Sequence, residues 1–429
     1  MKIVIKNATI INHNRVIKGD ILLQKGIISK IAKRIREKGD KEINADGKIV
    51  MPGFIDMHAH FRSPGREDEE DLQSGSMAAA RGGFVKVCCM PNTDPAIDNE
   101  STASWIRKES ERIGLIDIFP VGAITKGRKG EELTEFQALK NSGCLSLSED
   151  GSALKDSLLL RRALEYSKMS GLLIVSHCED ARLAAGGSIR EGSISSKHGI
   201  SGIPSIAESL IVARDVEIAK YLNTRIHIAH VSTARSLEII RRAKKEGALV
   251  TCETCPHYFS LTVEDIEENG FTGNYKVNPP LGDKKDIEAV KRALRDGTID
   301  CIATDHAPHS WAEKELPIED APFGFIGLET AFAAANTYLV KNKTVDYRMI
   351  AQKMAYNPAN ILGLTKCGKI QEGFQANVVI IDPEKRVLVS EKEIVSKSKN
   401  TPFLGTELTG VVETTIHRGH IIYNISTEK

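Results

Sequence analysis

The chain has 429 residues and an almost balanced charge, which narrows its class before any motif is considered. Lysine plus arginine number 58 and aspartate plus glutamate 57, for a formal net charge of +1. This balance gives no global electrostatic reason to bind nucleic acid or an anionic membrane. No apolar run approaches the ~20 residues of a spanning helix, and the N-terminus lacks a signal-peptide cleavage site. We therefore expect a cytoplasmic protein whose partner is a small molecule.

The eight cysteines do not form the pattern of a disulfide framework in so long a chain. Several lie inside apolar runs, as small buried residues do. Cys252 and Cys255 form a Cys-x-x-Cys pair, but a second pair that would complete a structural zinc site is missing. We expect no redox or metal role for this pair.

Both ends of the chain alternate apolar and polar residues in the manner of strands. In the first 52 residues this holds for 2–11 and 19–31, and in residues 366–429 for 376–384 and 410–424. Glycine, asparagine and aspartate turns separate these runs. Each flank is too small for a secure core of its own. The sequence therefore predicts one small β-sandwich domain made of residues 1–52 and 366–429.

The central part, residues 53–365, repeats a strand followed by a helix. Segments with helical spacing occur at 72–81, 156–169, 206–222 and 234–247. Eight short runs rich in strand-forming residues alternate with segments of helical character. These runs lie at 53–58, 83–90, 117–124, 143–148, 171–177, 225–230, 248–254 and 298–304. Such alternation predicts an α/β fold, a (β/α)₈ TIM-type barrel.

Potential metal ligands stand where these predicted strands end. In a barrel, catalytic groups gather at the carboxyl ends of the strands. Alone, each residue has an ordinary explanation, such as a turn, a helix cap or a hydrogen-bonded core histidine. Together, four imidazoles and two carboxylates at one rim make those explanations improbable. The six residues are His58, His60, Asp150, His177, His230 and Asp305.

Nitrogen and carboxylate ligands suit Zn²⁺, or Mn²⁺ and Co²⁺, and six ligands exceed the four of a structural zinc site. A binuclear centre with one bridging carboxylate and a hydroxide between the ions uses all six. Such a centre hydrolyses an amide, imide or ester. A carboxylate that touches both metal and water can carry the proton to the leaving nitrogen, and Asp305 is the candidate for this acid/base role.

Further polar residues near the same rim suggest a substrate clamp: Arg62, Asn92, Asn278 and His309. Arginine presents a planar fork that matches a carboxylate, which implies an anionic substrate. The alternative for Arg62 is a surface ion pair with the acidic run 66–72, "REDEEDL". The long polar segment 307–324 is expected to act as a lid over the site.

Motifs along nearly the whole chain carry a family resemblance. They include "GFIDMHAHFR" from Gly53, "ARGGFVKVCCMPNT" from Ala80, "HCED" from His177, "HVST" from His230, "NPPL" from Asn278, "DGTIDCIATDHAPH" from Asp296 and "EDAPFG" from Glu319. In these motifs the chain resembles the amidohydrolase superfamily and, within it, the class I dihydroorotases. The resemblance implies a zinc-dependent barrel enzyme that interconverts N-carbamoyl-L-aspartate and L-dihydroorotate in pyrimidine (UMP) synthesis.

The resemblance also implies a role for each matching position, with two Zn²⁺ per chain. It makes His58, His60 and Asp305 ligands of one metal, His177 and His230 ligands of the second, and Asp150 the bridge. Many relatives bridge with a carboxylated lysine, which this stretch does not offer. The implied substrate-binding residues are His60, Arg62, Asn92, Asn278, His309, Phe323 and Gly324.

Two departures keep alternatives open. Phe61 and Ser63, beside the arginine, differ from the usual motif, and "CETCPHYF" at 252–259 is closer to hydantoinases and allantoinases. The runner-up is therefore an allantoinase- or dihydropyrimidinase-like cyclic amidohydrolase. A catalytically silent scaffold is a third reading, disfavoured because all six ligands are kept. A complex with aspartate carbamoyltransferase and a homodimer are both left open.

Overall fold

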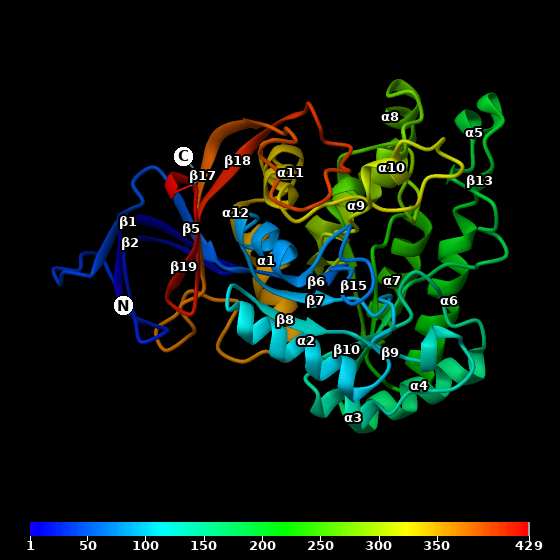
Figure 1. Ribbon diagram of the computed structural model, residues 1–429, viewed down its shortest axis with the longest axis horizontal. Helices are drawn as coiled ribbons and strands as arrows, with labels where there is room; N and C mark the ends of the chain where they lie inside the picture. Colours follow the sequence, from blue (N-terminus) through cyan, green and yellow to red (C-terminus); the bar gives the residue numbers. More distant parts are fainter. Residues whose placement is uncertain (428–429) are drawn as a thin grey trace.

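The computed structural model describes residues 1–427. It contains a closed barrel of short parallel strands and a separate sheet built from both ends of the chain (Figure 1). In Figure 1 the blue N-terminal strands and the red C-terminal strands lie together, beside the barrel. The predicted barrel and the shared β-structure of the two ends are thus confirmed.

The barrel strands follow the eight predicted runs, with the third run bent at Val121 into two pieces. Parallel pairing runs from β6 to β8 and from β9 to β16, and a bridge between Ala59 and His306 closes the ring. The strands are β6 Phe54–Ala59, β7 Phe84–Cys89, β8 Asp117–Pro120, β9 Gly122–Ala123, β10 Ser146–Ser148, β11 Leu173–Ser176, β14 Ile226–Ile228, β15 Val250–Thr254 and β16 Cys301–Ile302.

Helices surround the barrel, and several of them pack on its strands. Two of them continue into π-helical turns, so that 331–340 and 347–361 each form one longer helical segment. The helices are α1 Leu72–Arg81, α2 Glu100–Ile113, α3 Phe136–Asn141, α4 Ser157–Ser170, α5 Ser193–His198, α6 Ile206–Tyr221, α7 Ala234–Lys245, α8 Val263–Glu268, α9 Lys284–Asp296, α10 Trp311–Lys314, α11 Ala331–Ala335, α12 Tyr347–Ala351 and α13 Asn357–Ile361. None of the helices described is long and apolar enough to cross a membrane.

The terminal sheet joins the first and last segments in one hydrogen-bonded array. Its order is β19-β18-β17-β5-β1-β2-β3, with β4 paired beside β1. Isoleucine-rich faces of these strands bury a core separate from that of the barrel, as the alternation predicts. The strands are β1 Lys2–Asn12, β2 Arg15–Gln24, β3 Ile27–Ala32, β4 Lys41–Asn44, β5 Ile49–Pro52, β17 Val378–Leu388, β18 Glu407–His417 and β19 His420–Asn424; a short ribbon of β12 Ile189–Arg190 and β13 Gly202–Ile203 lies elsewhere.

The connection between β17 and β18 extends from the terminal sheet to the barrel rim. Its residue Asn400 accepts a hydrogen bond from Ile326 N through its backbone oxygen at 2.9 Å. The Asn400 side chain accepts from His309 N at 3.1 Å and donates to Gly324 O at 3.3 Å. A segment far from the barrel in sequence therefore helps to hold the loops at the carboxyl ends of the strands.

Candidate metal centre and substrate pocket

The six predicted ligands meet at the carboxyl ends of five barrel strands. His58 is the next-to-last residue of β6, and His60 comes directly after that strand; the other four lie within three residues of the ends of β10, β11, β14 and β16, namely Asp150, His177, His230 and Asp305. All six are at least nine-tenths buried. Two overlapping groups have ligand atoms within 4.8 Å of one another, namely His58, His60, Asp305 and His58, Asp150, His230. The fold thus brings residues almost 250 positions apart into one cluster.

Asp150 lies at the centre of this cluster. Its Oδ1 is 3.0 Å from His58 Nε2, 3.6 Å from His177 Nδ1 and 3.7 Å from His230 Nε2. Its Oδ2 is 3.4 Å from His60 Nε2. The neighbouring Glu149 turns away, because its carboxylate accepts hydrogen bonds from the backbone and hydroxyl of Thr125. Asp150 is therefore the carboxylate that faces both groups of histidines.

The donor set fits a divalent cation. His58 Nε2 and Asp150 Oδ1 are buried and 3.0 Å apart, yet neither has a hydrogen-bond partner within residues 1–427. Buried polar atoms are rarely left unsatisfied in this way, and an imidazole nitrogen beside a carboxylate is a preferred ligand pair for zinc. The two atoms lie close enough together to share a cation.

Two side chains behind the cluster orient its histidines. Glu253, on β15, lies with Oε1 3.1 Å from His58 Nδ1, and Asn92 Oδ1 lies 2.8 Å from His60 Nδ1. Each acceptor places a hydrogen on Nδ1, which leaves the Nε2 lone pair free to face a metal. The ring orientation of both histidines is thereby fixed before any cation binds.

Backbone conformation also aims the side chains. Arg62, His230 and Asp305 have positive φ values of 56°, 33° and 50°. Such a conformation is uncommon for residues other than glycine and is typically retained at functional sites. At each of the three positions the chain turns sharply just beyond a strand, so that the side chain projects over the barrel mouth.

The site keeps its carboxylates ionised. Burial alone would raise the pKa of Asp305, but the hydrogen bond to His60 and the charges of the neighbouring histidines outweigh it and lower the pKa to about 2. Burial likewise opposes the ionisation of Asp150, and His58, His177 and His230 hold its pKa well below the usual range. Two carboxylates at one centre supply the negative charge that two cations require.

A cavity of about 190 Å³ opens beside the cluster. It is small enough to enclose a ring of a few atoms rather than a polymer. Every residue predicted to bind substrate lies on its wall, and so do five of the six predicted ligands, with His60 in both sets. The lining consists of His60, Arg62, Asn92, Asp150, Gly151, His177, His230, Asn278, Asp305, Ala307, His309, Phe323 and Gly324.

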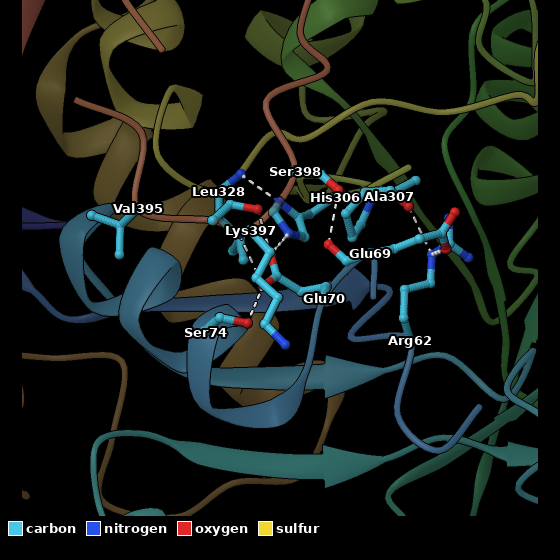
Figure 2. A network of polar contacts seen from close by, with 12 residues as sticks. Arg62, Glu69, Glu70, Ser74, His306, Ala307, Leu328, Val395, Lys397 and Ser398 are labelled. Atoms are coloured by element: carbon cyan, nitrogen blue, oxygen red, sulfur yellow. Dashed lines mark hydrogen bonds and ion pairs between the residues drawn. The ribbon is translucent and has the colours of Figure 1, made fainter. Parts of the chain in front are cut away.

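Arg62 and His309 form a second polar part of the wall of the same cavity. Arg62 Nη2 lies 3.1 Å from His309 Nε2, and Arg62 Nε donates to Pro308 O at 3.0 Å. Glu69, one of the residues of the acidic run, contacts both side chains, and Figure 2 shows it beside Arg62. The ion pair considered as the alternative for Arg62 thus forms, with Glu69. It is buried rather than at the surface, and Arg62 also lines the pocket.

The residues that depart from the family motif are outside the pocket. Phe61 is fully buried and packs against α1, where a Cβ on Gly75 would lie 2.6 Å from the phenylalanine ring. Ser63 donates to Glu67. All eight cysteines are buried and unpaired, so Cys252 and Cys255 form no disulfide. The departures therefore leave the described pocket walls unchanged.

The sequence reasoning missed Glu253 and assigned Glu69 to the surface. Glu253 is a charged residue inside the apolar run 248–254, and that contrast was a signal for a buried polar partner. Glu69 lies within a run in which Glu67 and Asp68 are exposed, whereas Glu69 and Glu70 are buried. Nothing in the run's composition separates the buried glutamates from the exposed residues.

Comparison with known proteins points to one family. A family model described as "Dihydro-orotase-like" matches residues 47–236, and an "Amidohydrolase family" model matches residues 203–423. The chain is 47% identical over 403 residues to a dihydroorotase of Acetivibrio thermocellus, covering 94% of each protein. It is also 47% identical over 424 residues to a dihydroorotase of Caldicellulosiruptor saccharolyticus, covering 98% of each.

Solved structures with the same fold include other cyclic amidohydrolases. The L-hydantoinase from Arthrobacter aurescens superposes with a TM-score of 0.87 at 24% identity, covering 98% of this chain and 96% of that one. The dihydropyrimidinase from Brevibacillus agri gives a TM-score of 0.87 at 22% identity, covering 99% and 95%. At this level of identity the likeness establishes the barrel fold alone.

Proposed function

The chain belongs to the dihydroorotase family of amidohydrolases, and from this premise we propose how its residues divide the work of that reaction. It is a metal-dependent cyclic amidohydrolase, a dihydroorotase that interconverts N-carbamoyl-L-aspartate and L-dihydroorotate in pyrimidine synthesis. The observation that carries the assignment of roles is the single pocket in which Arg62 and His309 face the cluster around Asp150. One wall suits a carboxylate and the other a reacting amide.

We assign two Zn²⁺ ions to the cluster. His58, His60 and Asp305 would hold the first, His177 and His230 would hold the second, and Asp150 would be shared between them. The unsatisfied, buried atoms of His58 and Asp150 support this assignment. When bound, such cations polarise a carbonyl and lower the pKa of water, which is the chemistry amide hydrolysis requires.

The substrate carboxylate lies against Arg62, Asn92 and His309 in this proposal. Asn92 uses its Oδ1 to hold His60, so its amide NH₂ remains to donate into the pocket. Asn278 and the backbone at Phe323 and Gly324 contact the ring from the remaining walls. This arrangement fixes the ring so that its reacting amide faces Asp305.

Asp305 moves the proton. As a ligand of the cation it would be ionised before the attacking water arrives. Water adds to the ring amide carbon, Asp305 accepts a proton from the water and gives it to the departing nitrogen, and the carbon–nitrogen bond breaks to leave the N-carbamoyl group. Ring closure reverses these steps.

The proposal extends to architecture and partners. We propose that residues 53–365 form the catalytic domain and that residues 1–52 with 366–429 form the second, of which 428–429 lie outside the described residues; the division is supported by which strands share a sheet. We propose that the enzyme lies in the cytoplasm, together with the other enzymes of pyrimidine synthesis. Sedimentation of the protein alone, and mixed with aspartate carbamoyltransferase, will test a homodimer and a complex.

The competing substrates provide the test. Purified, metal-loaded protein should turn over L-dihydroorotate far faster than allantoin or dihydrouracil, with two zinc ions per chain by elemental analysis. Faster turnover of dihydrouracil or allantoin would assign the chain to the sister activity with the same barrel. Full metal content with no turnover of any of the three would favour the silent scaffold.

A further inference from the structure

Glu69 has an environment that an acidic residue in a charged surface run does not require. Its side chain is 1% exposed, although Glu67 and Asp68 before it are exposed. Burying a carboxylate is unfavourable unless each oxygen has a partner. Both oxygens of Glu69 contact residues of the pocket wall. A buried charge that contacts two substrate-facing side chains is suited to positioning them.

We infer that Glu69 is a positioning residue of the dihydroorotase site, which sets the orientation of Arg62 and His309 toward the substrate carboxylate. The inference rests on the proposed function, because it assigns the purpose of the Arg62 wall. Glu69 does not line the pocket and touches no reacting atom. It acts through its two neighbours.

The first contact fixes Arg62. Glu69 Oε2 lies 3.2 Å from Arg62 Nε, and Pro308 O accepts from the same nitrogen at 3.0 Å. With Nε held in this way the guanidinium plane is fixed, and Nη1 and the second hydrogen of Nη2 remain for the pocket. A planar fork presented in this way matches the two oxygens of a carboxylate.

The second contact fixes His309. Glu69 Oε1 lies 2.9 Å from His309 Nδ1, so that the hydrogen of the ring is on Nδ1. Burial lowers the pKa of His309, and the hydrogen bond to Glu69 opposes this effect. On the other side of the ring, Nε2 lies 2.8 Å from the backbone oxygen of Phe323 and 3.1 Å from Arg62 Nη2. One carboxylate therefore couples the two side chains into a single unit.

Glu69 itself is held on both sides. Ser398, on the connection between β17 and β18, donates to the Glu69 backbone oxygen at 2.8 Å, and Figure 2 shows Glu69 between Ser398 and Arg62. Arg66 Nη2 lies 3.0 Å from Glu69 Oε1 and 2.9 Å from Glu313 Oε1. The arginine fills the space between these carboxylates, so the grouping of Glu69, His309 and Glu313 is an ion-pair network rather than a metal site.

A glutamine at this position separates positioning from packing. Its amide has nearly the shape of the carboxylate but only one accepting oxygen, so either Arg62 Nε or His309 Nδ1 meets an N–H group instead. Glu69→Gln should lower kcat/KM for dihydroorotate by ~10–100-fold, the range found when an orienting neighbour is lost. Zinc content and melting temperature should change little. Asp68→Asn, the matched control next in sequence and exposed, should behave as wild type.

Two further comparisons decide the cause. Glu69→Asp keeps the charge and loses one methylene, so it should retain more activity than Glu69→Gln; the reverse order would mean that only shape matters. In an Arg62→Met background, Glu69→Gln should cost less than about threefold, because contacting residues act non-additively. Full additivity would overturn the inference. If the wild-type protein does not turn over dihydroorotate, the proposed function is refuted. If the wild type is active and Glu69→Gln is equally active, only the role of Glu69 is refuted.

Discussion

The two walls of the pocket are built in different ways. The metal wall consists of side chains at the ends of β6, β10, β11, β14 and β16, each placed by a strand of the barrel. The carboxylate wall consists of Arg62 and His309 on loops, held by Glu69 and by Asn400 from the connection between β17 and β18. A regular scaffold can carry reaction chemistry shared by many relatives, while loops that pack on one another carry substrate choice. Variants in the two walls should therefore fail in different ways.

The largest effect should follow from a change at the centre of the metal wall. Asp150→Ala removes the carboxylate that faces both groups of histidines, so two repelling cations lose their bridge. Activity should fall by at least ~10³-fold, the upper range for removing one electrostatic stabiliser. Elemental analysis should show the loss of one or both ions. If the variant keeps two metals per chain and near-normal turnover, Asp150 is only a turn residue and does not bridge the metals.

A change in the carboxylate wall should spare the metals. Arg62→Met should lower kcat/KM for dihydroorotate by ~100-fold, the scale of a lost charge-assisted pair that also orients the ring. Metal content should stay at the wild-type value. Any weak turnover of dihydrouracil, which has no carboxylate, should decline much less. Comparable losses on both substrates would mean that Arg62 supports the fold rather than selecting the substrate.

The support behind the metal wall should have an intermediate effect. Glu253 lies behind His58, and contacts with His227 and His58 overcome the opposing effect of burial and lower the pKa of Glu253 to about 2. Glu253→Gln should weaken zinc affinity by ~10–100-fold, as loss of such an outer partner commonly does. Competition with a chelator measures this directly. Unchanged affinity would show that the barrel alone orients His58.

The smallest effect is expected in the segment 307–324. Its helix α10 exposes Trp311, whose relative accessibility is 73%, but buries Lys314, which donates to Pro322 O and Gly324 O. We expect faster hydrogen exchange here than in the barrel strands, with protection increased when dihydroorotate is added. Protection that is the same with and without substrate would remove the lid role and leave a fixed wall.

The contrast between the walls also explains what the sequence could predict. The barrel and its metal wall follow from short apolar runs that each end in a histidine or an aspartate, which are local patterns. Arg62 and His309 were found for the same reason, since each lies within a few residues of a predicted ligand. Their neighbour Glu69 was not, because its burial depends on Ser398, which is 329 residues away.

Parts of the fold escaped prediction for a related reason. The helical segments 331–340 and 347–361 and the connection between β17 and β18 lie outside the eight strand runs, and no repeat marks them. The position of Asn400 at the barrel rim depends on how the terminal sheet packs against the barrel. Long-range packing of this kind leaves no periodic pattern in a single sequence.

The separation of the two walls can be observed directly in a crystal structure of the zinc-loaded protein with L-dihydroorotate, using anomalous scattering to locate the metals. The account predicts two zinc ions, with Asp150 between them, and the substrate carboxylate within hydrogen-bond distance of the Arg62 guanidinium while the ring amide faces Asp305. A substrate carboxylate bound to the metals, with Arg62 contacting only Glu69, would contradict it.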